Sequence, residues 1–373
     1  MPVINALRLT DFRSYRSLDL PLDGRPIVLF GQNGAGKTNL MEAVSLLSPG
    51  RGLRGAKPDA LARMTPSGPA GAWGVVASIN TDDGPVKLAV GQVPEYPRRR
   101  TMRIDGKTAA GPAMAALMPM MWLTPAQDRL FTGPASDRRK FLDRFCLSYK
   151  PSHGTAFLRY EKARAERNRL LSDGVEDVSW YRALETDMAH FGAQVASARA
   201  QTVTKLRAEI SQREDGAFPK AKIALEGEAE AECEAGLDIA AIEDNIAQRL
   251  RDDRSLDLRA GRTRRGVHKS DLAVHHAPKN MPAQACSTGE QKALLIGLVL
   301  AQARAQSGQR PILLLDEVAA HLDELRRAAM IEELLDLGTQ AFLTGTDRSL
   351  FDAFAGRAQS FHVHEGVITP VKS

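Results

Sequence analysis

The stretch Gly31–Gln32–Asn33–Gly34–Ala35–Gly36–Lys37–Thr38 decides the fold of this 373-residue chain. It matches the phosphate-binding pattern G-x-x-x-x-G-K-[ST] at every fixed position. The glycines allow the backbone to close around phosphate groups with its N–H groups pointing inward. The preceding RPIVLFG has the pattern of a strand, and the following NLMEAVSLLS has helical spacing. A helix that begins here presents its positive end to the same anion.

Individual side chains of this loop have distinct expected roles. Lys37 would reach the β- and γ-phosphates, and the Thr38 hydroxyl would ligate Mg²⁺. A glycine-rich turn without a ligand is the alternative, but the strand and helix that such a loop requires are both predicted. The sequence therefore predicts ATP and Mg²⁺ as cofactors. The expected nucleotide-binding residues are Gly31, Gln32, Asn33, Gly34, Ala35, Gly36, Lys37, Thr38 and Asn39.

A second motif, ILLLDE at residues 312–317, lies near the other end of the chain. Its four apolar residues predict a strand buried on both faces. Asp316 and Glu317 follow at the carboxyl end, where open α/β sheets bind ligands. Asp316 is the expected metal-organising carboxylate, and Glu317 the group that orients and deprotonates the attacking water. Buried strands often end in acids without a function, so this interpretation depends on the pairing with the phosphate loop.

A third segment, Cys286–Ser287–Thr288–Gly289–Glu290, opens a predicted helix and resembles the LSGGQ or LSGGE signature of ABC and SMC ATPases. The resemblance implies that Ser287, Thr288, Gly289 and Glu290 hold the γ-phosphate bound by a second subunit, so that each site is completed by dimerisation. An ordinary capping box, with Ser287 as N-cap and Glu290 three residues later, gives the same pattern. Both interpretations can hold. Asp316 follows Ser287 by 29 residues, which favours the functional one.

Three further residues fall in the order that this resemblance implies, and Arg54 is a separate candidate near the phosphate loop. Gln127 resembles a Q-loop glutamine that contacts Mg²⁺ and γ-phosphate, although an isolated glutamine is usually a surface residue. Asp323 resembles a residue of the D-loop that crosses a dimer interface. Thr344 ends the next predicted strand near the place where many ABC proteins have a switch histidine, and its hydroxyl would contact phosphate. Arg54 would contact nucleotide phosphate near the loop.

The pattern along the chain predicts an α/β fold, an ABC/SMC-type ATPase head with a mixed sheet and an inserted α-helical lobe. The head is expected from residues 1–150 and 262–373, and the lobe from residues 151–261. From about Thr155 to Arg213 the chain is charged and helical in period. Within it, apolar residues from Trp180 to Ile210 recur mostly every three or four positions, as in a helix roughly 50 Å long. This stripe fits an ordinary helical lobe better than a coiled coil that binds a partner. Its members are Trp180, Leu184, Met188, Phe191, Val195, Leu206 and Ile210.

Composition limits the class of protein. Hydrophobic residues make up 43% of the chain, enough for a folded core, and the net charge of +5 alone predicts little. Cys146, Cys233 and Cys286 form no C-x-x-C pair and are expected as free thiols in a reducing compartment. The longest apolar run, Leu294–Ala301, is too short for a membrane span. A cytoplasmic protein without a membrane partner is expected.

Taken together, these segments resemble the RecF family of bacterial DNA repair proteins over essentially the whole chain. The insert between Lys37 and Ser287 is longer than in ABC transporters and shorter than in SMC proteins, which favours the same family. The sequence departs from the family pattern at Cys286, Thr288 and Glu317, and it has GVHKSD where the family often has a Gly-Pro-His-Arg-Asp run. The resemblance rests on residues 7–20 (LRLTDFRSYRSLDL), 31–55, 124–143, 287–301 and 313–323 (LLLDEVAAHLD).

The resemblance implies an ATP-dependent protein of recombinational gap repair that is associated with the nucleoid. It implies binding to duplex DNA near junctions of single and double strands, an ATP-dependent homodimer, and slow ATP hydrolysis that DNA stimulates. It also implies RecR as a partner, with RecO and RecA in the pathway. In that pathway, proteins of this family work with RecR and RecO to help load RecA.

Clusters of basic residues are the candidates for DNA contacts. Such clusters neutralise phosphates and release counterions, so binding would fall steeply with salt. No aromatic residue lies inside them, which predicts contacts with the duplex backbone without base stacking. Any single cluster also fits an ordinary solvated face. The candidates are Arg98, Arg99, Arg100, Arg138, Arg139, Lys140, Arg262, Arg264 and Arg265.

Three functions remain open at this point. The first is an ATP-switched DNA clamp with slow hydrolysis, the second an ATPase subunit of a transporter, and the third an adaptor in which ATP only fixes the shape. Salt-sensitive DNA binding by the isolated chain separates the first from the second. Phosphate release with and without DNA separates the first from the third.

Overall fold

The computed structural model describes residues 2–93, 99–306, 308 and 310–371. Contacts divide the chain into two compact units. Unit 1 comprises Met1–Asp128, Asp215–Phe218 and Leu295–Ser373, and unit 2 comprises Arg129–Glu214 and Pro219–Leu294. Within the described ranges no helix has both the length and the hydropathy to cross a membrane.

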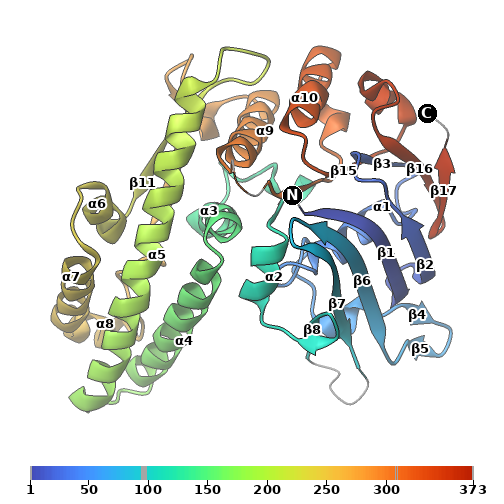
Figure 1. The fold of residues 1–373 in the computed structure, drawn as a ribbon. Coiled ribbons are helices and arrows are strands. Elements are labelled where there is room, and N and C mark those ends of the chain that lie inside the picture. Colours follow the sequence, from blue (N-terminus) through green and yellow to red (C-terminus); the bar gives the residue numbers. More distant parts are fainter. Residues whose placement is uncertain (1, 94–98, 307, 309, 372–373) are drawn as a thin grey trace. The chain divides into compact units, whose positions relative to one another are not determined.

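The central sheet of unit 1 joins the two ends of the chain, as the blue β3 beside the red β16 illustrates in Figure 1. All neighbouring strands run parallel except the last pair, which is antiparallel. Every residue of β14 and β15 is buried, which explains their uninterrupted apolar sequence. In order, the strands are β10 (Met120–Leu123), β14 (Ile312–Leu315), β15 (Ala341–Gly345), β3 (Ile27–Phe30), β16 (Gln359–His364) and β17 (Val367–Val371).

A second, antiparallel sheet of unit 1 comes from the first third of the chain. Buried and exposed residues alternate along β6, as expected for a strand with one face on the core. Helix α1 (Lys37–Ser45) contacts both β6 and β15, so a single hydrophobic core joins the two sheets. In order, the strands are β2 (Tyr15–Pro21), β1 (Val3–Phe12), β6 (Trp73–Thr81), β7 (Gly84–Gln92), β8 (Thr101–Ile104) and β9 (Lys107–Thr108).

The remaining elements of unit 1 connect these strands or cover them. Helix α10 follows β14 and leads into β15, which gives the strand–helix–strand order predicted for the last third of the chain. The elements are η1 (Pro58–Leu61), β4 (Met64–Thr65), β5 (Gly68–Pro69), α2 (Gly111–Leu117), η2 (Pro125–Gln127), η4 (Ala319–His321), α10 (Glu324–Leu337) and η5 (Arg348–Phe354).

Unit 2 is mostly helical, with α5 packed against α4 and α7. The expected apolar stripe belongs to α5, a helix of 35 residues, and its later members are buried. Trp180 does not belong to this stripe, since 61% of its surface is exposed. The helices are α3 (Ala135–Tyr149), α4 (Ser152–Ser172), α5 (Val178–Gln212), α6 (Glu228–Glu234), α7 (Ile239–Asp252) and α8 (Arg254–Ala260).

Unit 2 also contains a small sheet that the sequence did not predict. Strand β11 (Ala221–Glu226) pairs with β12 (Asp271–His276), which pairs with β13 (Met281–Pro282), all antiparallel. The short η3 (Ala283–Ala285) then leads to α9 (Thr288–Ala305), inside which the contact-defined boundary between the units falls. The expected division into a head from 1–150 and 262–373 and a lobe from 151–261 stays a prediction.

Two buried arginines hold the helices of unit 2 together. Arg167 on α4 binds Asp257 at 2.7 Å and Glu185 on α5 at 3.2 Å, and all three side chains are almost fully buried. Arg199 on α5 binds Asp143 of α3 at 2.8 Å and Glu230 of α6 at 3.1 Å. Removal of one partner from such a pair leaves an uncompensated buried charge, which costs about 3–5 kcal/mol.

Candidate functional site

The glycines of the phosphate loop lie where the backbone requires them. Gly34 and Gly36 have φ angles of 83° and 119°, in a region that other residues rarely adopt. At Gly31, a Cβ atom would lie 2.2 Å from the carbonyl oxygen of Val363 in β16. The loop therefore closes tightly between the end of β3 and the start of α1, as the motif predicts.

Tyr15 supports this loop from the start of β2. Its hydroxyl donates a hydrogen bond to the Gly36 carbonyl oxygen at 3.0 Å, and a Cβ at Gly36 would lie 3.0 Å from the same hydroxyl. Burial raises the pKa of Tyr15, so the hydroxyl remains a donor. Sequence reasoning missed this contact, because Tyr15 looks like any aromatic residue of an alternating strand.

Lys37 rests on the carbonyl groups of its own loop. Its ammonium donates to the carbonyl oxygens of Gly31 at 2.6 Å and Gln32 at 2.9 Å, and only 3% of the residue is exposed. Burial lowers the pKa of Lys37, while the carboxylates of Glu317 and Asp316 act in the opposite direction. The Lys37 ammonium is thus held at the loop with two carboxylates in its electrostatic neighbourhood.

Asp316 lies at the centre of a hydrogen-bonded network. Its Oδ1 accepts from the Thr38 hydroxyl at 3.0 Å and from the Thr344 hydroxyl at 2.8 Å. The strand order explains the meeting, because α1 follows β3, and β3 and β14 both lie beside β15. The structure therefore brings together the expected Mg²⁺ ligands Thr38 and Asp316 from opposite ends of the chain.

Glu317 adopts a backbone conformation that is rare for a non-glycine residue, with φ at 54°. Its backbone N–H donates to the Thr344 hydroxyl oxygen at 2.8 Å. The fully buried Thr344 hydroxyl thus accepts from Glu317 and gives its one hydrogen to Asp316. This arrangement argues against the expected contact of Thr344 with phosphate.

Gln127 lies at the same edge of the sheet as Asp316, but its side chain binds the backbone at the start of its own 3₁₀ helix, η2. Its Oε1 accepts from the Thr124 backbone N–H at 2.9 Å, within a capping box at the start of η2. The neighbouring Leu123 carbonyl accepts from the Asp316 N–H at 2.8 Å, which joins the ends of β10 and β14. For Gln127 to ligate a metal ion through Oε1, the Thr124 N–H would have to give up this bond.

Arg54 lies beside the helix that follows the phosphate loop. Its Nη1 donates to Asn39 Oδ1 at 2.8 Å and lies 3.5 Å from the Glu42 carboxylate. Glu42 is fully buried and receives two hydrogen bonds from Arg13, at 2.8 and 2.9 Å. Arg13 and Glu42 were missed from the sequence, although an acid within the apolar run LMEAVSLL was a usable signal.

The signature-like segment begins α9 in unit 2 and has the geometry of a capping box. The Ser287 hydroxyl and N–H both donate to Glu290 Oε2 at 2.9 Å. A hydrogen bond from Lys279 and those from Ser287 lower the pKa of Glu290 to about 2, so the carboxylate stays ionised. Ser287, Thr288 and Gly289 are exposed, and a Cβ at Gly289 would meet no atom within 4 Å.

Asp323 caps the next helix. Its side chain accepts from the Arg326 backbone N–H at 2.8 Å at the start of α10, and it is exposed. An N-cap aspartate satisfies a helix N–H that has no partner within the helix, so this contact has a local structural reason. Its role at a dimer interface stays a prediction.

The basic candidates for DNA contacts differ in how firmly they are bound within the chain. Arg138 makes two hydrogen bonds of 2.7 Å to the Asp271 carboxylate, and Arg139 donates to the Ser270 carbonyl at 2.7 Å. Lys140 pairs with Asp137 at 2.9 Å but is 76% exposed. Arg138 is thus mainly a cross-link between α3 and β12.

The first basic cluster is only partly described. Arg98 lies outside the described residues, and Arg99 is exposed. Arg100 is half-buried, its Nη2 lies 3.5 Å from the Ser48 carbonyl oxygen, and burial lowers its pKa to about 10.

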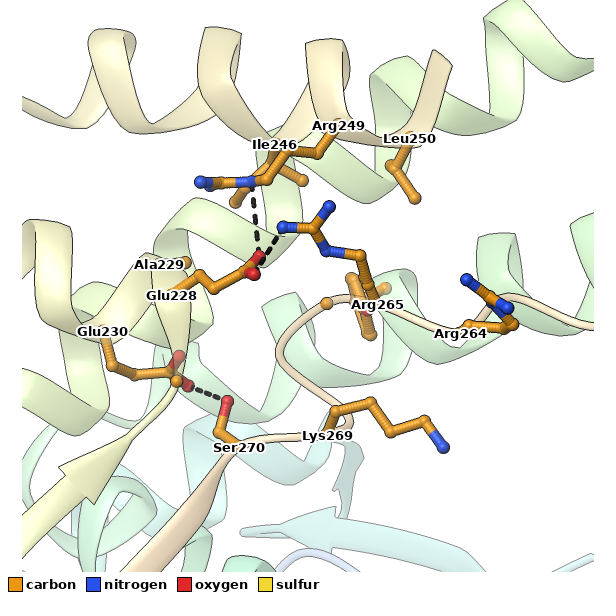
Figure 2. Close-up of a pocket in the computed structure, with 13 residues that line it drawn as sticks. Glu228, Ala229, Glu230, Ile246, Arg249, Leu250, Arg264, Arg265, Lys269 and Ser270 are labelled. Atoms are coloured by element: carbon orange, nitrogen blue, oxygen red, sulfur yellow. Dashed lines mark hydrogen bonds and ion pairs between the residues drawn. The ribbon is translucent and has the colours of Figure 1, made fainter. Parts of the chain in front are cut away.

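The last basic cluster lines a pocket of about 180 Å³ in unit 2, which Figure 2 shows. Arg265 binds Glu228 at 2.5 Å, whereas the closest charged partner of Arg264 is Asp257 at 3.8 Å. Lys269 is exposed, and Figure 2 draws no ion pair between its ammonium and the other residues that line the pocket. Arg262 is exposed and precedes the pocket residue Arg264 by two positions in the sequence. Arg262, Arg264 and Lys269 are therefore less firmly paired than Arg265 within the described part of this cluster.

Comparison with known protein families gives one match over almost the entire chain. The model described as RecF/RecN/SMC N terminal domain matches residues 3–369. The DNA replication and repair protein RecF of Caulobacter sp. (strain K31) is 49% identical over 383 residues, covering 98% of both chains. The protein of the same name from Mesorhizobium japonicum is 48% identical over 375 residues, covering 99% of this chain and 98% of its own.

Solved structures confirm the expected fold class. The recombination mediator protein RecF with ATP matches with a TM-score of 0.83 at 22% identity, over 99% of this chain and 98% of that chain. The Smc head domain from Pyrococcus furiosus, bound to the C-terminal domain of ScpA, matches with a TM-score of 0.57 at 16% identity. The match covers 100% of this chain and 96% of that chain. At such low identity these likenesses show the fold alone.

Proposed function

The chain belongs to the RecF family, and from that premise we propose that it is an ATP-dependent DNA-binding protein of recombinational repair that dimerises on ATP and hydrolyses it slowly. The observation that carries the proposal is the meeting of Lys37, Thr38, Asp316 and Glu317 within unit 1. These residues come from opposite ends of the chain, so their meeting depends on the fold.

Nucleotide binding is the first part of the proposal. The loop N–H groups and the start of α1 suit an anion, and Lys37 adds a positive charge. Thr38 and Asp316 offer two oxygen ligands at 3.0 Å from each other, the ligand type that Mg²⁺ prefers, so these residues fit the ion. A bound Mg²⁺ would neutralise phosphate charge there. The Lys37 ammonium would exchange its hydrogen bonds to the Gly31 and Gln32 carbonyl oxygens for contacts with the phosphates.

Hydrolysis is assigned to Glu317. Its carboxylate follows the metal-binding Asp316 directly, and its backbone is held by the Thr344 hydroxyl. We propose that Glu317 orients the attacking water and accepts its proton. Gln127, at the same edge, is proposed to contact Mg²⁺ once its bond to Thr124 opens.

Dimerisation is proposed because the signature-like segment leaves polar groups at the surface. The first N–H groups of α9 can donate to an anion, as can the Ser287 hydroxyl once its bond to Glu290 opens, and Gly289 leaves room for a close approach. The γ-phosphate of a nucleotide held by a second copy is the proposed anion, with Asp323 near the joint surface. Each copy would then supply only part of each reaction centre.

DNA, RecR, RecO and RecA are the proposed partners. Two relatives with about half of their residues identical to this chain are named as DNA replication and repair proteins, and the matching ATP-bound structure is described as part of the RecFOR pathway. Arg264, Lys269, Arg262 and Arg99 are the proposed backbone contacts, because they are exposed. Duplex DNA next to a single-stranded gap is the proposed substrate.

The test is the variant Glu317→Gln, which keeps the shape of the side chain and removes the base. Phosphate release should fall by about 10²-fold or more, while dimers persist in saturating Mg·ATP by light scattering. Lys37→Ala is the matched control and should lose nucleotide binding and dimers together. A Glu317→Gln chain that stays monomeric in saturating Mg·ATP would contradict the proposal.

A further inference from the structure

Thr344 occupies an unusual position among the residues of the nucleotide site. It is 0% exposed and lies in β15, between the strand that carries Asp316 and the strand that precedes the phosphate loop. Its hydroxyl contacts two successive residues of the other motif, Asp316 through the side chain and Glu317 through the backbone. No other side chain in the described chain bridges these two carboxylate residues by hydrogen bonds.

The direction of each hydrogen bond is fixed by chemistry. A backbone N–H can only donate, so the Thr344 oxygen accepts from Glu317 at 2.8 Å. The hydroxyl hydrogen is then free for one acceptor, and Asp316 Oδ1 lies at 2.8 Å. The result is a chain of two aligned bonds, from the Glu317 N–H through the Thr344 hydroxyl to the Asp316 carboxylate. Such chains polarise and strengthen one another in a buried site.

The backbone of Glu317 needs this support. A φ of 54° costs a non-glycine residue of order 1–3 kcal/mol and persists only where the surroundings hold it. The hydrogen bond to the Thr344 hydroxyl restrains the Glu317 N–H. The direction of the Glu317 side chain depends on this φ angle, because the angle sets the orientation of the Cα–Cβ bond relative to β14.

The same Asp316 oxygen also accepts from Thr38 on the phosphate-loop helix at 3.0 Å. Thr38, Asp316, Thr344 and Glu317 therefore form one continuous network from the expected metal ligands to the expected base. A change in the position of Asp316 Oδ1 on metal binding would be transmitted to the Glu317 backbone through one hydroxyl.

We infer that Thr344 is a positioning residue that couples the metal ligand Asp316 to the catalytic Glu317. This inference rests on the proposed function, which supplies the roles of those two residues. Thr344 touches neither phosphate nor metal in this role, and it replaces the phosphate contact expected from the sequence. Its hydroxyl is needed to aim the Glu317 carboxylate at water, and it is not needed to bind the nucleotide.

The test compares Thr344→Val with Thr344→Ser in the full-length chain. Valine keeps the shape and removes both hydrogen bonds, whereas serine keeps the hydroxyl. For Thr344→Val we expect kcat to fall about 10- to 100-fold with the KM for ATP within about twofold, as for loss of an interaction made only in the transition state. Thr344→Ser should keep most of the activity. A raised KM with unchanged kcat would overturn the inference and favour a phosphate contact.

A double-mutant cycle separates positioning from a general structural effect. If Thr344 acts through Glu317, Thr344→Val should have little further effect on kcat in a Glu317→Gln chain, because the base is already absent. If the effects of the two substitutions on log kcat added fully, Thr344 would not act through Glu317. If the proposed function is wrong, the parent chain will not hydrolyse ATP. If only the inference about Thr344 is wrong, the parent will hydrolyse ATP and Thr344→Val will have the same kcat.

A measurement without nucleotide completes the design. Hydrogen exchange of the peptide that contains Glu317 should be faster in Thr344→Val than in the parent, since the Glu317 N–H loses its acceptor. Peptides from α1 should keep their exchange rates, and the melting temperature reports whether the variant is folded. Equal exchange at Glu317 in the two folded chains would show that the bond does not hold this backbone.

Discussion

At the scale of single residues, Asp316 shows how one atom can serve several partners. Its Oδ1 accepts from Thr38 and Thr344, two hydroxyls that come from different elements. A carboxylate oxygen has two lone pairs, so these donors satisfy it within the chain. Binding of the proposed Mg²⁺ would therefore redirect at least the Thr38 hydrogen, because the Thr38 oxygen and Asp316 would then both face the cation.

His268 is a half-buried titratable residue outside the nucleotide site. Its Nδ1 lies 2.7 Å from the Tyr160 hydroxyl, and its Nε2 lies 3.2 Å from the Thr263 carbonyl oxygen. Burial, and after it the charge of Arg164, lowers the pKa of His268 to about 3. The folded chain thus keeps this ring neutral at pH values where the unfolded chain, with a pKa of about 6.5, takes up a proton.

This difference makes the stability depend on pH. Because the pKa of His268 is lower in the folded chain, the neutral ring contributes to the free energy of unfolding. This contribution is complete above about pH 6.5 and decreases toward pH 3, by up to about 1.4 kcal/mol per pH unit. The variant His268→Gln can keep both hydrogen bonds without titrating. Urea unfolding at pH 7.5 and 5.5 should show a loss in the parent that is about 1.4 kcal/mol larger than in the variant. Equal losses would contradict the assignment.

At the scale of elements, the start of α9 has a local and an external interpretation. Ser287 and Glu290 form a capping box, which the helix needs to satisfy its first N–H groups. Gly289 has no such reason, because its position is helical and a Cβ there would meet nothing within 4 Å. A glycine in a helix costs roughly 0.5–1 kcal/mol relative to alanine, so its presence points to a partner outside the chain.

Gly289→Ala tests these two interpretations. The isolated chain should be as stable as the parent or more stable, by up to about 1 kcal/mol, while dimerisation in Mg·ATP should weaken at least tenfold by light scattering. Gly71→Ala is a matched control, since Gly71 also has open space around it and lies in unit 1. Unchanged dimerisation of Gly289→Ala would remove this glycine from the proposed interface.

At the scale of the whole molecule, charge distribution matters more than net charge. The chain carries only +5, and many of its arginines are bound to carboxylates within the chain. An arginine that already binds two carboxylate oxygens offers little to a DNA phosphate. Arg138 belongs to this bound class. Among the described residues, Arg264 has only an ion pair of 3.8 Å with Asp257, and Lys269 is exposed.

DNA binding should separate these two classes. For gapped duplex DNA, Arg264→Gln and Lys269→Gln should each weaken binding and reduce the slope of log affinity against log salt by about 1. Arg138→Gln should keep the slope and lower the melting temperature, because it leaves Asp271 without its partner. The outcome that contradicts this assignment is a reduced slope in Arg138→Gln with the parent's melting temperature.

The sequence alone predicted the elements whose reasons are local. The strand, glycine loop and helix at 27–45 could be predicted because positive φ angles and helix starts impose requirements on a few adjacent residues. The buried strand 312–315 and the helix starting at Thr288 followed from apolar runs and capping for the same reason. The pairing of β11 with β12 was missed, since it joins residues about fifty positions apart along the chain.

Only the tertiary structure decided which distant side chains these residues contact. Thr344 meets Asp316 across 28 positions, Arg13 meets Glu42 across 29, and Arg138 meets Asp271 across 133. A side chain of a strand end or a helix face has no local preference for one distant partner over another. The order of strands in the sheet selects the partner, and that order results from packing the whole core. The sequence by itself thus determined which residues can do chemistry, and the fold determined which of them act on one another.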